Sequence, residues 1–432
     1  MRRLLIALLL MVVACGQPLA KSATSPVAAV PFTPTATASA VPSTSPAASP
    51  SAASPSPAAS PGPAASPQPT PRPLPSPSTT LLFALVERKA GANPWVLNAV
   101  SIAGLDGRVR ARATFASMSE PSMGCMGAVI PPSAQVAGGK IYYADPTGTV
   151  RSLAVDGTVA VVATFPMASS QQMLSFAVSP DGSQVLGTLF TIPKNAFPCS
   201  GSPAAATFSF DAYSALAGHA SNLVYHQSWN RIPSAVLMLT GWDAVGPIGQ
   251  YPTVWGTQGG GPGSELGVFV RIDPTSVKVR SKFSDPNSCL TWSSVASGAS
   301  VCLPFPTFQG AGTDTQITDQ PVIVRRASGG EIWAASVTSA NGAWGPVLAP
   351  DGRHLIICGA DGADSNPTWV LGQDKSKILV TNSFIPEGWL DAKTLIGSSA
   401  TAPGALAWAL SADPTNFRTI AVAGDFLGTI PA

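Results

Sequence analysis

Three histidines, His219, His226 and His354, are the only imidazole groups in the 432 residues. Nucleophilic catalysis by serine requires a base held beside the nucleophile, and histidine is the usual base. The G-x-S-x-G sequence that presents a serine nucleophile is absent, and GGGPGSELG at 259–267 also lacks the G-x-G-x-x-G spacing of a dinucleotide-binding loop. We interpret this stretch as a loop and predict no catalytic residue and no cofactor.

The histidine, aspartate and asparagine residues give only weak support for a metal-binding site. His219 and His226 bracket the strand-like ASNLVY, and residues seven apart on a strand point to opposite faces, so we expect no shared metal. Asp361, Asp364 and Asn366 in GADGADSN offer oxygen atoms to calcium. They lack the twelve-residue loop and bidentate glutamate of an EF-hand. We therefore name no metal ligand, and a calcium site stays an alternative.

Ten tryptophans form the other group of residues that could recognise a ligand. An aromatic side chain on a loop can stack on a sugar or anchor a partner protein. Packing between sheets is the ordinary alternative, and we favour it for each residue alone. The tryptophans in loop-like sequence are Trp229, Trp242, Trp255, Trp292 and Trp344.

The cysteines indicate disulfide bonds rather than a zinc site, because the chain has no C-x-x-C pair. Cys289 and Cys302 close a short loop rich in serine and glycine, and we predict that they are paired. A second predicted pair is Cys125 with Cys199. Cys358 lies in HLIICGA, which is typical of a strand, and we expect it to be buried as a small hydrophobic residue.

The N-terminus carries a targeting signal. Two arginines precede an apolar stretch at 4–14, which at ~1.5 Å per residue is about half the length needed to cross a ~30 Å hydrocarbon core. A secretory signal is the better interpretation. The sequence Val12-Val13-Ala14-Cys15 resembles the lipobox of bacterial lipoproteins. This resemblance implies cleavage before Cys15 and lipid attachment to its sulfur; an ordinary signal peptide with a chance cysteine is the alternative.

The chain is therefore divided into three parts. Residues 1–14 are the predicted signal peptide, 15–78 a lipidated N-terminus and disordered stalk, and 79–432 a folded domain. The stalk consists almost wholly of proline, alanine, serine and threonine, which cannot bury enough apolar surface to fold. We expect an extracytoplasmic protein anchored to a bacterial membrane, with the lipid bilayer as its first partner.

Charge excludes one class of partner. The formal net charge of +2 is accounted for by Arg2 and Arg3, which the predicted cleavage removes. No basic block follows, whereas nucleic-acid binding requires clustered cations that neutralise phosphates. We expect no nucleic-acid partner.

A repeat runs through the folded domain. LDGRVRARATF at 105–115 and VDGTVAVVATF at 155–165 each place Asp-Gly before an alternating run that ends in Ala-Thr-Phe. Asp-Gly favours a hairpin turn because glycine accepts positive φ, and the alternating run is typical of a half-buried strand. Weaker copies and two irregular hairpins follow at the spacing of β-propeller blades. The predicted turn centres are Asp106, Asp156, Asp211, Asp273, Ser328, Asp374 and Asp413.

A second type of turn identifies the fold more closely. AVSPDGSQVLGT at 177–188 and VLAPDGRHLIICG at 347–359 place Pro-Asp-Gly between two short strands, and EGWLDAKTLIG at 387–397 is similar. This unit resembles the TolB-like and WD40-like propeller repeats of bacterial envelope proteins. The resemblance implies an all-β propeller, for which the hairpins indicate seven blades; six or eight stay open. We expect the tail GDFLGTIPA to supply the innermost strand of the first blade.

Two functions are open at this point. A tethered monomeric propeller without catalytic residues is expected to bind or scaffold an envelope protein or glycan on one rim. The alternative is an extracytoplasmic enzyme, such as a lyase, lactonase or glycoside hydrolase, with its site at the central channel. Propellers host both kinds of function, and converging carboxyl groups with shifted pKa values would favour the enzyme.

Overall fold

The computed structural model is built from β-strands that are joined by turns and loops. Among the residues that the structure describes, no helix is long and apolar enough to cross a membrane. The described residues are 81–89, 96–119, 121–122, 126–128, 131–194, 196, 206–231, 233, 236–251, 255–257, 268–282, 299–304, 308–309, 316–317, 320–326, 329–338, 343–359, 367–380, 383–402 and 404–431. Cys15 and the predicted stalk lie outside them.

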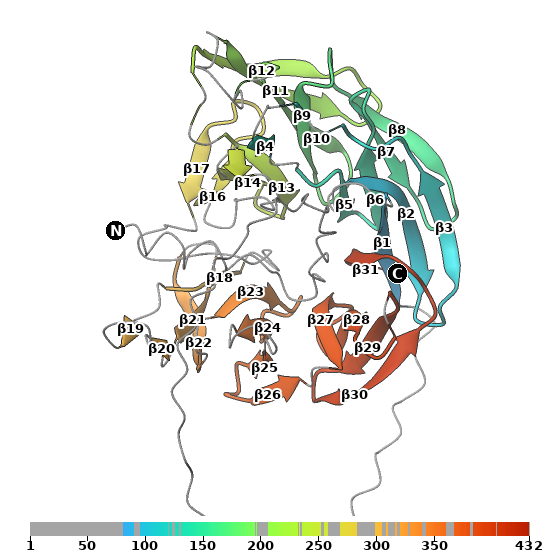
Figure 1. The fold of residues 1–432 in the computed structure, drawn as a ribbon, viewed down its shortest axis with the longest axis vertical. Coiled ribbons are helices and arrows are strands. Elements are labelled where there is room, and N and C mark those ends of the chain that lie inside the picture. The colour runs from blue at the N-terminus through green and yellow to red at the C-terminus, as the bar shows by residue number, and fades with distance from the viewer. Residues whose placement is uncertain are drawn as a thin grey trace, which may run out of the picture. The chain divides into compact units, whose positions relative to one another are not determined.

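Seven antiparallel sheets follow one another along the chain as the blades of a β-propeller (Figure 1). From the centre outward, blade one consists of β31 (Asp425–Ile430), β1 (Leu82–Arg88), β2 (Leu97–Gly104) and β3 (Val109–Thr114). Blade two consists of β5 (Ala134–Ala137), β6 (Lys140–Ala144), β7 (Thr149–Leu153) and β8 (Val159–Thr164). Blade three consists of β9 (Gln172–Val178), β10 (Gln184–Thr191), β11 (Phe208–Leu216) and β12 (Asn222–Trp229).

Blade four consists of β13 (Met238–Trp242), β14 (Pro247–Tyr251), β16 (Val268–Ile272) and β17 (Val279–Lys282). Blade five shows three strands, β18 (Ser300–Cys302), β21 (Gln320–Arg325) and β22 (Glu331–Val337). Blade six consists of β23 (Ala343–Leu348), β24 (His354–Gly359), β25 (Thr368–Gly372) and β26 (Lys377–Val380). Blade seven consists of β27 (Phe384–Trp389), β28 (Thr394–Ser399), β29 (Leu406–Leu410) and β30 (Asp413–Ile420).

Two further two-stranded sheets lie outside the blades. β4 (Met126–Ala128), which follows blade one, pairs with β15 (Trp255–Thr257) from blade four. β19 (Phe308–Gln309) pairs with β20 (Gln316–Ile317) in the connection between β18 and β21. The first of these pairs links the connections of blades that are distant in the chain.

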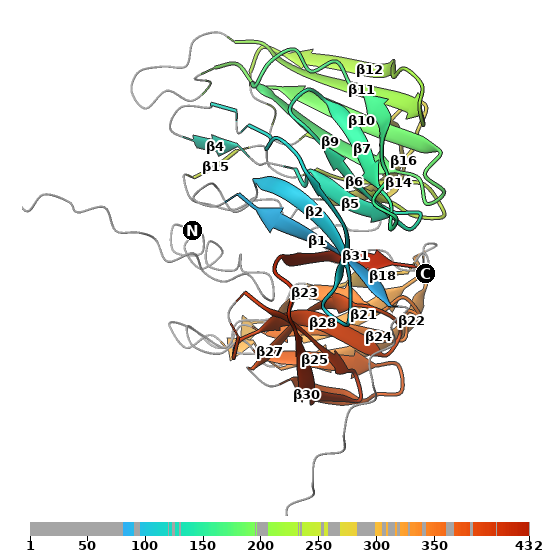
Figure 2. The same ribbon diagram turned by 90° about the vertical axis from the view of Figure 1, so that its right-hand side faces the viewer.

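The C-terminal strand β31 closes the ring by pairing with β1 (Figures 1 and 2). The antiparallel register places Leu82 opposite Ile430 and Val86 opposite Asp425. The prediction that the tail supplies the innermost strand of the first blade is confirmed. Because the two ends of the chain share one sheet, blade seven adjoins blade one.

Aspartate side chains shape the turns within the blades. In each turn, the carboxylate oxygen Oδ1 accepts a hydrogen bond of 2.8–3.1 Å from the backbone N–H two residues later. This local bond stabilises the turn conformation. The residues that act in this way are Asp106, Asp145, Asp156, Asp181, Asp243, Asp273, Asp351, Asp374 and Asp391.

One predicted hairpin is wrong. Asp211 lies in the middle of β11, and the turn to β12 comes later, at 217–221. The carboxylate Oδ1 of Asp211 lies 2.6 Å from Nδ1 of His226 on β12. Asp211 therefore interacts across two strands, whereas the prediction assumed that an aspartate between apolar runs marks a turn.

The core lies between neighbouring blades. Phe165, the last residue of the second Ala-Thr-Phe repeat, is fully buried in the cluster that joins blades two and three. A Cβ atom on Gly187 of β10 would lie only 2.5 Å from the Phe165 ring, so glycine is what allows this close approach. The phenylalanine of the repeat is thus the residue by which one blade packs on the next.

Candidate functional site

A groove of about 780 Å³ lies between the outer strands of blades three and four. Its volume is within the range of ~300–1,000 Å³ that is common for ligand-binding sites. One wall comes from blade three, and the other comes from β14 and the β16–β17 turn of blade four. The lining residues are Phe210, Tyr225, Gln227, Trp229, Arg231, Pro233, Val236, Leu237, Tyr251, Ser276, Val277, Lys278 and Val279.

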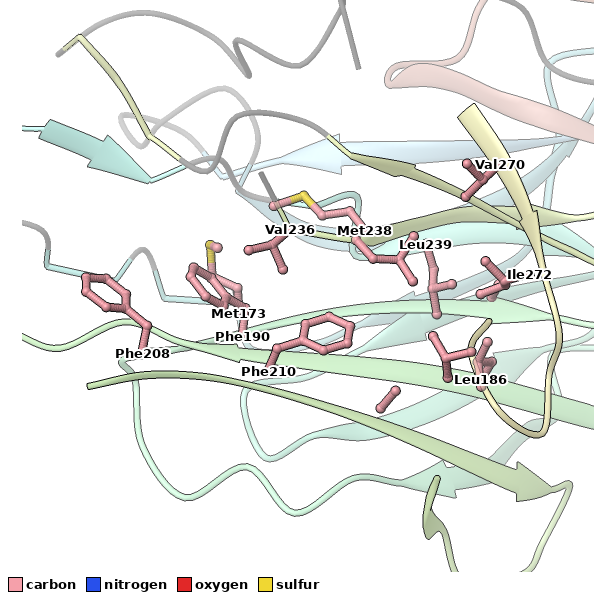
Figure 3. Close-up of a cluster of buried hydrophobic side chains, with 14 of the residues drawn as sticks. Met173, Leu186, Phe190, Phe208, Phe210, Val236, Met238, Leu239, Val270 and Ile272 are labelled. Carbon is pink, nitrogen blue, oxygen red and sulfur yellow. The ribbon is translucent and has the colours of Figure 1, made fainter. Parts of the chain in front are cut away.

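The floor of the groove continues the buried core between the two blades. Phe210 from blade three and Val236 and Leu237 from blade four are 3–4% exposed and belong to both the core cluster and the groove. Figure 3 shows Phe190 and Phe210 facing the side chains at the start of blade four. This packing holds the floor in place, so that the groove does not depend on a ligand to form.

The blade-three wall follows from the alternation of side chains along β12. Tyr225, Gln227 and Trp229 are two residues apart and share one face of the strand. β12 is the outermost strand of its sheet, and Tyr225, Gln227 and Trp229 all line the groove. The Tyr225 side chain is 40% exposed, and its hydroxyl donates a hydrogen bond of 2.8 Å to Oε1 of Gln227.

Edge-to-face contacts orient the aromatic rings of this wall. The ring of Phe210 lies 6.1 Å from that of Tyr225, and the ring of Phe190 lies 6.5 Å from that of Trp229. Such tilted contacts are the preferred geometry of aromatic pairs. Each outer ring is therefore held by a buried phenylalanine beneath it.

The blade-four wall contains a strained turn. Val277 has a φ of 58°, in the left-handed region that residues with a branched Cβ rarely adopt. Its amide donates a 2.8 Å hydrogen bond to the carbonyl oxygen of Asp273, and its side chain is buried in the core cluster. Such strain persists where surrounding structure fixes it, and it occurs often at binding sites. Burial also raises the pKa of Tyr251 on the same wall, so its hydroxyl stays neutral.

The charge of the groove has one sign. Arg231 follows β12 on one wall and Lys278 precedes β17 on the other, and both side chains are exposed. Among the lining residues that the structure describes, none is acidic. Neither cation forms an ion pair with another described residue. The groove therefore offers aromatic faces, an oriented amide and two cations, which suit binding rather than bond cleavage.

A second cluster of polar groups lies where blade seven meets blade one. Glu387 is in a bulge of β27 between Pro386 and Gly388, and its carboxylate accepts a hydrogen bond from the hydroxyl of Ser398. Asp425, at the start of β31, forms an ion pair with Arg88 at the end of β1. Burial raises the pKa of Glu387 to about 7; the hydrogen bond from Ser398 opposes this effect, and the charge of Asp425 adds to it.

The sequence did not identify this cluster. EGWLDAKTLIG was interpreted only as a blade unit, because nothing in it shows that Glu387 lies near Asp425 of β31 and near Arg88, which is about 300 residues earlier in the chain. The Pro-Glu-Gly sequence is a weak signal of a strand bulge. The groove was missed for a similar reason, since its walls come from two blades.

None of the three histidines lines the groove, although His226 is on the same strand as its blade-three wall. His219 is in the turn after β11, His226 is on β12 beside Asp211, and Nδ1 of His354 lies 3.5 Å from the carboxylate of Asp351. In the described part of the chain, no three histidine, cysteine, aspartate or glutamate side chains are grouped to hold a metal. Asp361, Asp364, Asn366 and the glycine-rich stretch at 259–267 lie outside that part.

Four of the five tryptophans in loop-like sequence lie in strands. Trp229 ends β12 and Trp242 ends β13, and both are partly buried against the core between blades three and four, in agreement with the packing favoured from sequence. Trp255 and Trp344 are also in strands, β15 and β23, and Trp292 is outside the described residues.

Two cysteines are described, and both are disulfide-bonded. Cys302 lies in β18 and Cys358 in β24, and each is 1% exposed. Cys358 is buried in a strand as expected, but it is not only a small hydrophobic residue, because it also forms a disulfide. Cys125, Cys199 and Cys289 lie outside the described residues, so both predicted pairings stay predictions.

Comparisons with known proteins found only distant structural similarity. No family model and no curated protein matches the sequence. Among solved structures, an oligogalacturonate lyase in complex with manganese has a TM-score of 0.42 and 11% identity, covering 70% of this chain and 79% of its own. BamB from Moraxella catarrhalis has a TM-score of 0.31 and 14% identity, with 71% and 78% covered. TolB from Acinetobacter baumannii has a TM-score of 0.33 and 9% identity, with 80% of each chain covered.

The class of the protein follows from these observations. It is an all-β protein whose described residues form a seven-bladed propeller. Identities this low do not transfer an activity, because propellers carry many unrelated functions.

Proposed function

We propose that this protein is a membrane-anchored, extracytoplasmic β-propeller that binds an envelope protein or glycan without catalysis. The groove between blades three and four carries this proposal. Tyr225 and Trp229 present aromatic faces above a rigid floor, and the described lining residues include neither a nucleophile–base pair nor a carboxyl pair. Preformed sites with aromatic linings and a few polar groups are typical of ligand binding.

The proposed location has two independent supports. The sequence begins with a basic and apolar signal that ends at Cys15. In addition, Cys302 and Cys358 are disulfide-bonded, and such bonds persist mainly in oxidising compartments outside the cytoplasm. We propose that a lipid on Cys15 holds the propeller at a bacterial membrane through the stalk at 16–78.

Catalysis is the second candidate, because one observation favours it. The raised pKa of Glu387, about 7, is what a general acid requires at neutral pH, and Asp425 is a neighbouring carboxylate. However, Glu387 lies at the junction of blades seven and one, whereas the groove lies between blades three and four. The acid and the binding surface are therefore separate, and we favour binding.

Retention on cell-envelope material tests the binding function. The groove is tested in the Cys15→Ser background, because a lipid on Cys15 would hold any variant on membranes. This chain is mixed with an envelope fraction of the source bacterium and sedimented. We expect the chain with the unaltered groove to be retained and the chain that also carries Tyr225→Ala/Trp229→Ala to be released, because both rings are lost. Leu379→Ala is the control, since Leu379 is a 56% exposed apolar residue of blade six outside the groove. Equal retention of the chains with the unaltered and the altered groove would contradict the proposal.

Mass spectrometry of the mature N-terminus tests the anchor. We expect protein purified from membranes to begin at Cys15 and to carry a diacylglyceryl group on its sulfur. Cys15→Ser is the matched variant and should leave the membrane fraction. An unmodified Cys15 in the wild type would contradict anchoring and would make a freely diffusing protein the better interpretation.

A further inference from the structure

We infer that the groove between blades three and four binds a saccharide chain that carries carboxylate groups. This inference rests on the proposed function, because it names the ligand class for the same groove. Three properties of the lining carry it: exposed aromatic faces, an oriented amide and one cation on each wall.

The aromatic residues suit pyranose rings. Tyr225, Trp229 and Tyr251 line the groove from both walls, and each keeps part of its surface exposed. An amphipathic aromatic ring can stack on the apolar face of a sugar while its hydroxyl or N–H bonds the sugar's hydroxyl groups. Phe210 and Phe190 hold the rings of Tyr225 and Trp229 by edge-to-face contact, so little side-chain entropy is lost on binding.

The polar residues suit hydroxyl and carboxylate groups. Gln227 is exposed, and its Oε1 atom accepts a hydrogen bond from the Tyr225 hydroxyl. The amide nitrogen of Gln227 can therefore donate a hydrogen bond to a ligand. Arg231 and Lys278 provide a cation on each wall. Because no described lining residue is acidic, an anionic chain would be attracted by a cation on each wall and would not be repelled by a carboxylate of the lining.

A peptide fits the groove less well. Pairing of a peptide strand with β12 would use the backbone edge of that strand. The groove is instead lined by the side chains of one β12 face, at Tyr225, Gln227 and Trp229. The lining therefore recognises the faces and substituents of a chain of rings more readily than a backbone.

Calorimetric titration with a matched pair of saccharides tests the inference. The probes are an oligosaccharide of 1,4-linked uronic acids and the same chain with its carboxylates reduced to primary alcohols. We expect the mature protein to bind the acidic chain at least about tenfold more tightly, since charge-assisted bonds are lost on reduction. Arg231→Gln/Lys278→Gln should remove this preference, and Trp229→Ala should weaken binding of both probes.

Two exposed lysines outside the groove provide the control. Lys140→Gln/Lys393→Gln removes the same charge from blades two and seven and should leave the preference unchanged. Equal binding of both probes, or no binding of the acidic probe, would overturn the inference. If envelope material still requires Tyr225 and Trp229 while the acidic probe does not bind, the proposed function stands and the ligand class is wrong. Cleavage of the acidic probe would support the ligand class and contradict binding without catalysis.

Discussion

The groove between blades three and four and the junction between blades seven and one are equivalent spaces that are filled in opposite ways. In the groove, Tyr225 on the outermost strand of blade three is 40% exposed, and each wall carries one cationic side chain, Arg231 or Lys278. At the junction, β31 packs against β27, and the acidic group of Glu387 faces Asp425 and Arg88. One space is open and lined with rings; the other is closed around a carboxyl group.

Close packing at glycine occurs in both regions. At the junction, a Cβ atom on Gly388 would lie 2.2 Å from the Phe426 ring of β31, and within blade seven one on Gly397 of β28 would lie 2.0 Å from the carbonyl oxygen of Ile385 on β27. Beside the groove, a Cβ atom on Gly249 of β14 would lie 2.4 Å from Leu237 of the floor, whereas Gly241 of β13 has no atom within 4 Å of such a Cβ. The comparison shows that glycine permits close approach under both spaces, so the difference between them lies in the side chains that line each one.

The largest effect is expected from Gly397→Ala. The added methyl group would meet backbone atoms of Ile385, Pro386 and Glu387 at 2.0–2.8 Å, and backbone cannot move aside as a flexible side chain can. We expect a loss of more than ~3 kcal/mol in the free energy of unfolding, measured by chemical denaturation. The bulge that holds Glu387 would be distorted, because these atoms belong to it.

Gly241→Ala is the matched control for this prediction. It adds the same methyl group to a strand where space is available, and we expect a change between zero and a gain of ~1 kcal/mol. Similar losses in the two variants would show that the close approach of backbone at Gly397 is not what makes its substitution destabilising.

The next effect is a pH dependence that arises at the junction. The pKa of Glu387 is about 7 in the folded protein against a usual value of 4.5, so the folded state binds more protons between these values. The free energy of unfolding should therefore fall as the pH rises from 4.5 to about 7, by up to ~3 kcal/mol. Glu387→Gln cannot ionise and retains an oxygen atom for Ser398, so this decrease should disappear.

Thermal unfolding of the two proteins at pH 5 and pH 8 measures this effect. The wild type should lose several degrees of melting temperature at the higher pH, and Glu387→Gln should lose less. Glu331→Gln, which changes an exposed glutamate of blade five, should behave as the wild type. An unchanged pH dependence in Glu387→Gln would assign the effect to other groups.

Local patterns in the sequence predicted the blades, but not either of the two spaces. Asp106 and Asp156 mark hairpins because each carboxylate bonds the backbone two residues later, and that interaction needs no distant partner. Asp211 follows a similar local pattern, yet its partner is His226 on the next strand. Patterns within a blade are visible in sequence, whereas a partner across strands is not.

The candidate site was beyond prediction for the same physical reason. The alternation along β12 shows that Tyr225 and Trp229 share a face, but not that Lys278 lies across from them. Glu387 and Asp425 are brought together only by closure of the ring. Both spaces lie between blades, so their residues come from separate repeats.

The smallest expected effect refines the description of the groove. Tyr225→Phe removes the hydroxyl that donates to Gln227 but keeps the aromatic face and its contact with Phe210. Because Tyr225 is exposed, the free energy of unfolding should change by less than ~0.5 kcal/mol. Affinity for the acidic saccharide should fall by about threefold to tenfold, since one net hydrogen bond orients the amide. A calorimetric titration that gives wild-type affinity for Tyr225→Phe, but none for Tyr225→Ala, would show that the ring alone is used and that Gln227 is not part of the recognition surface.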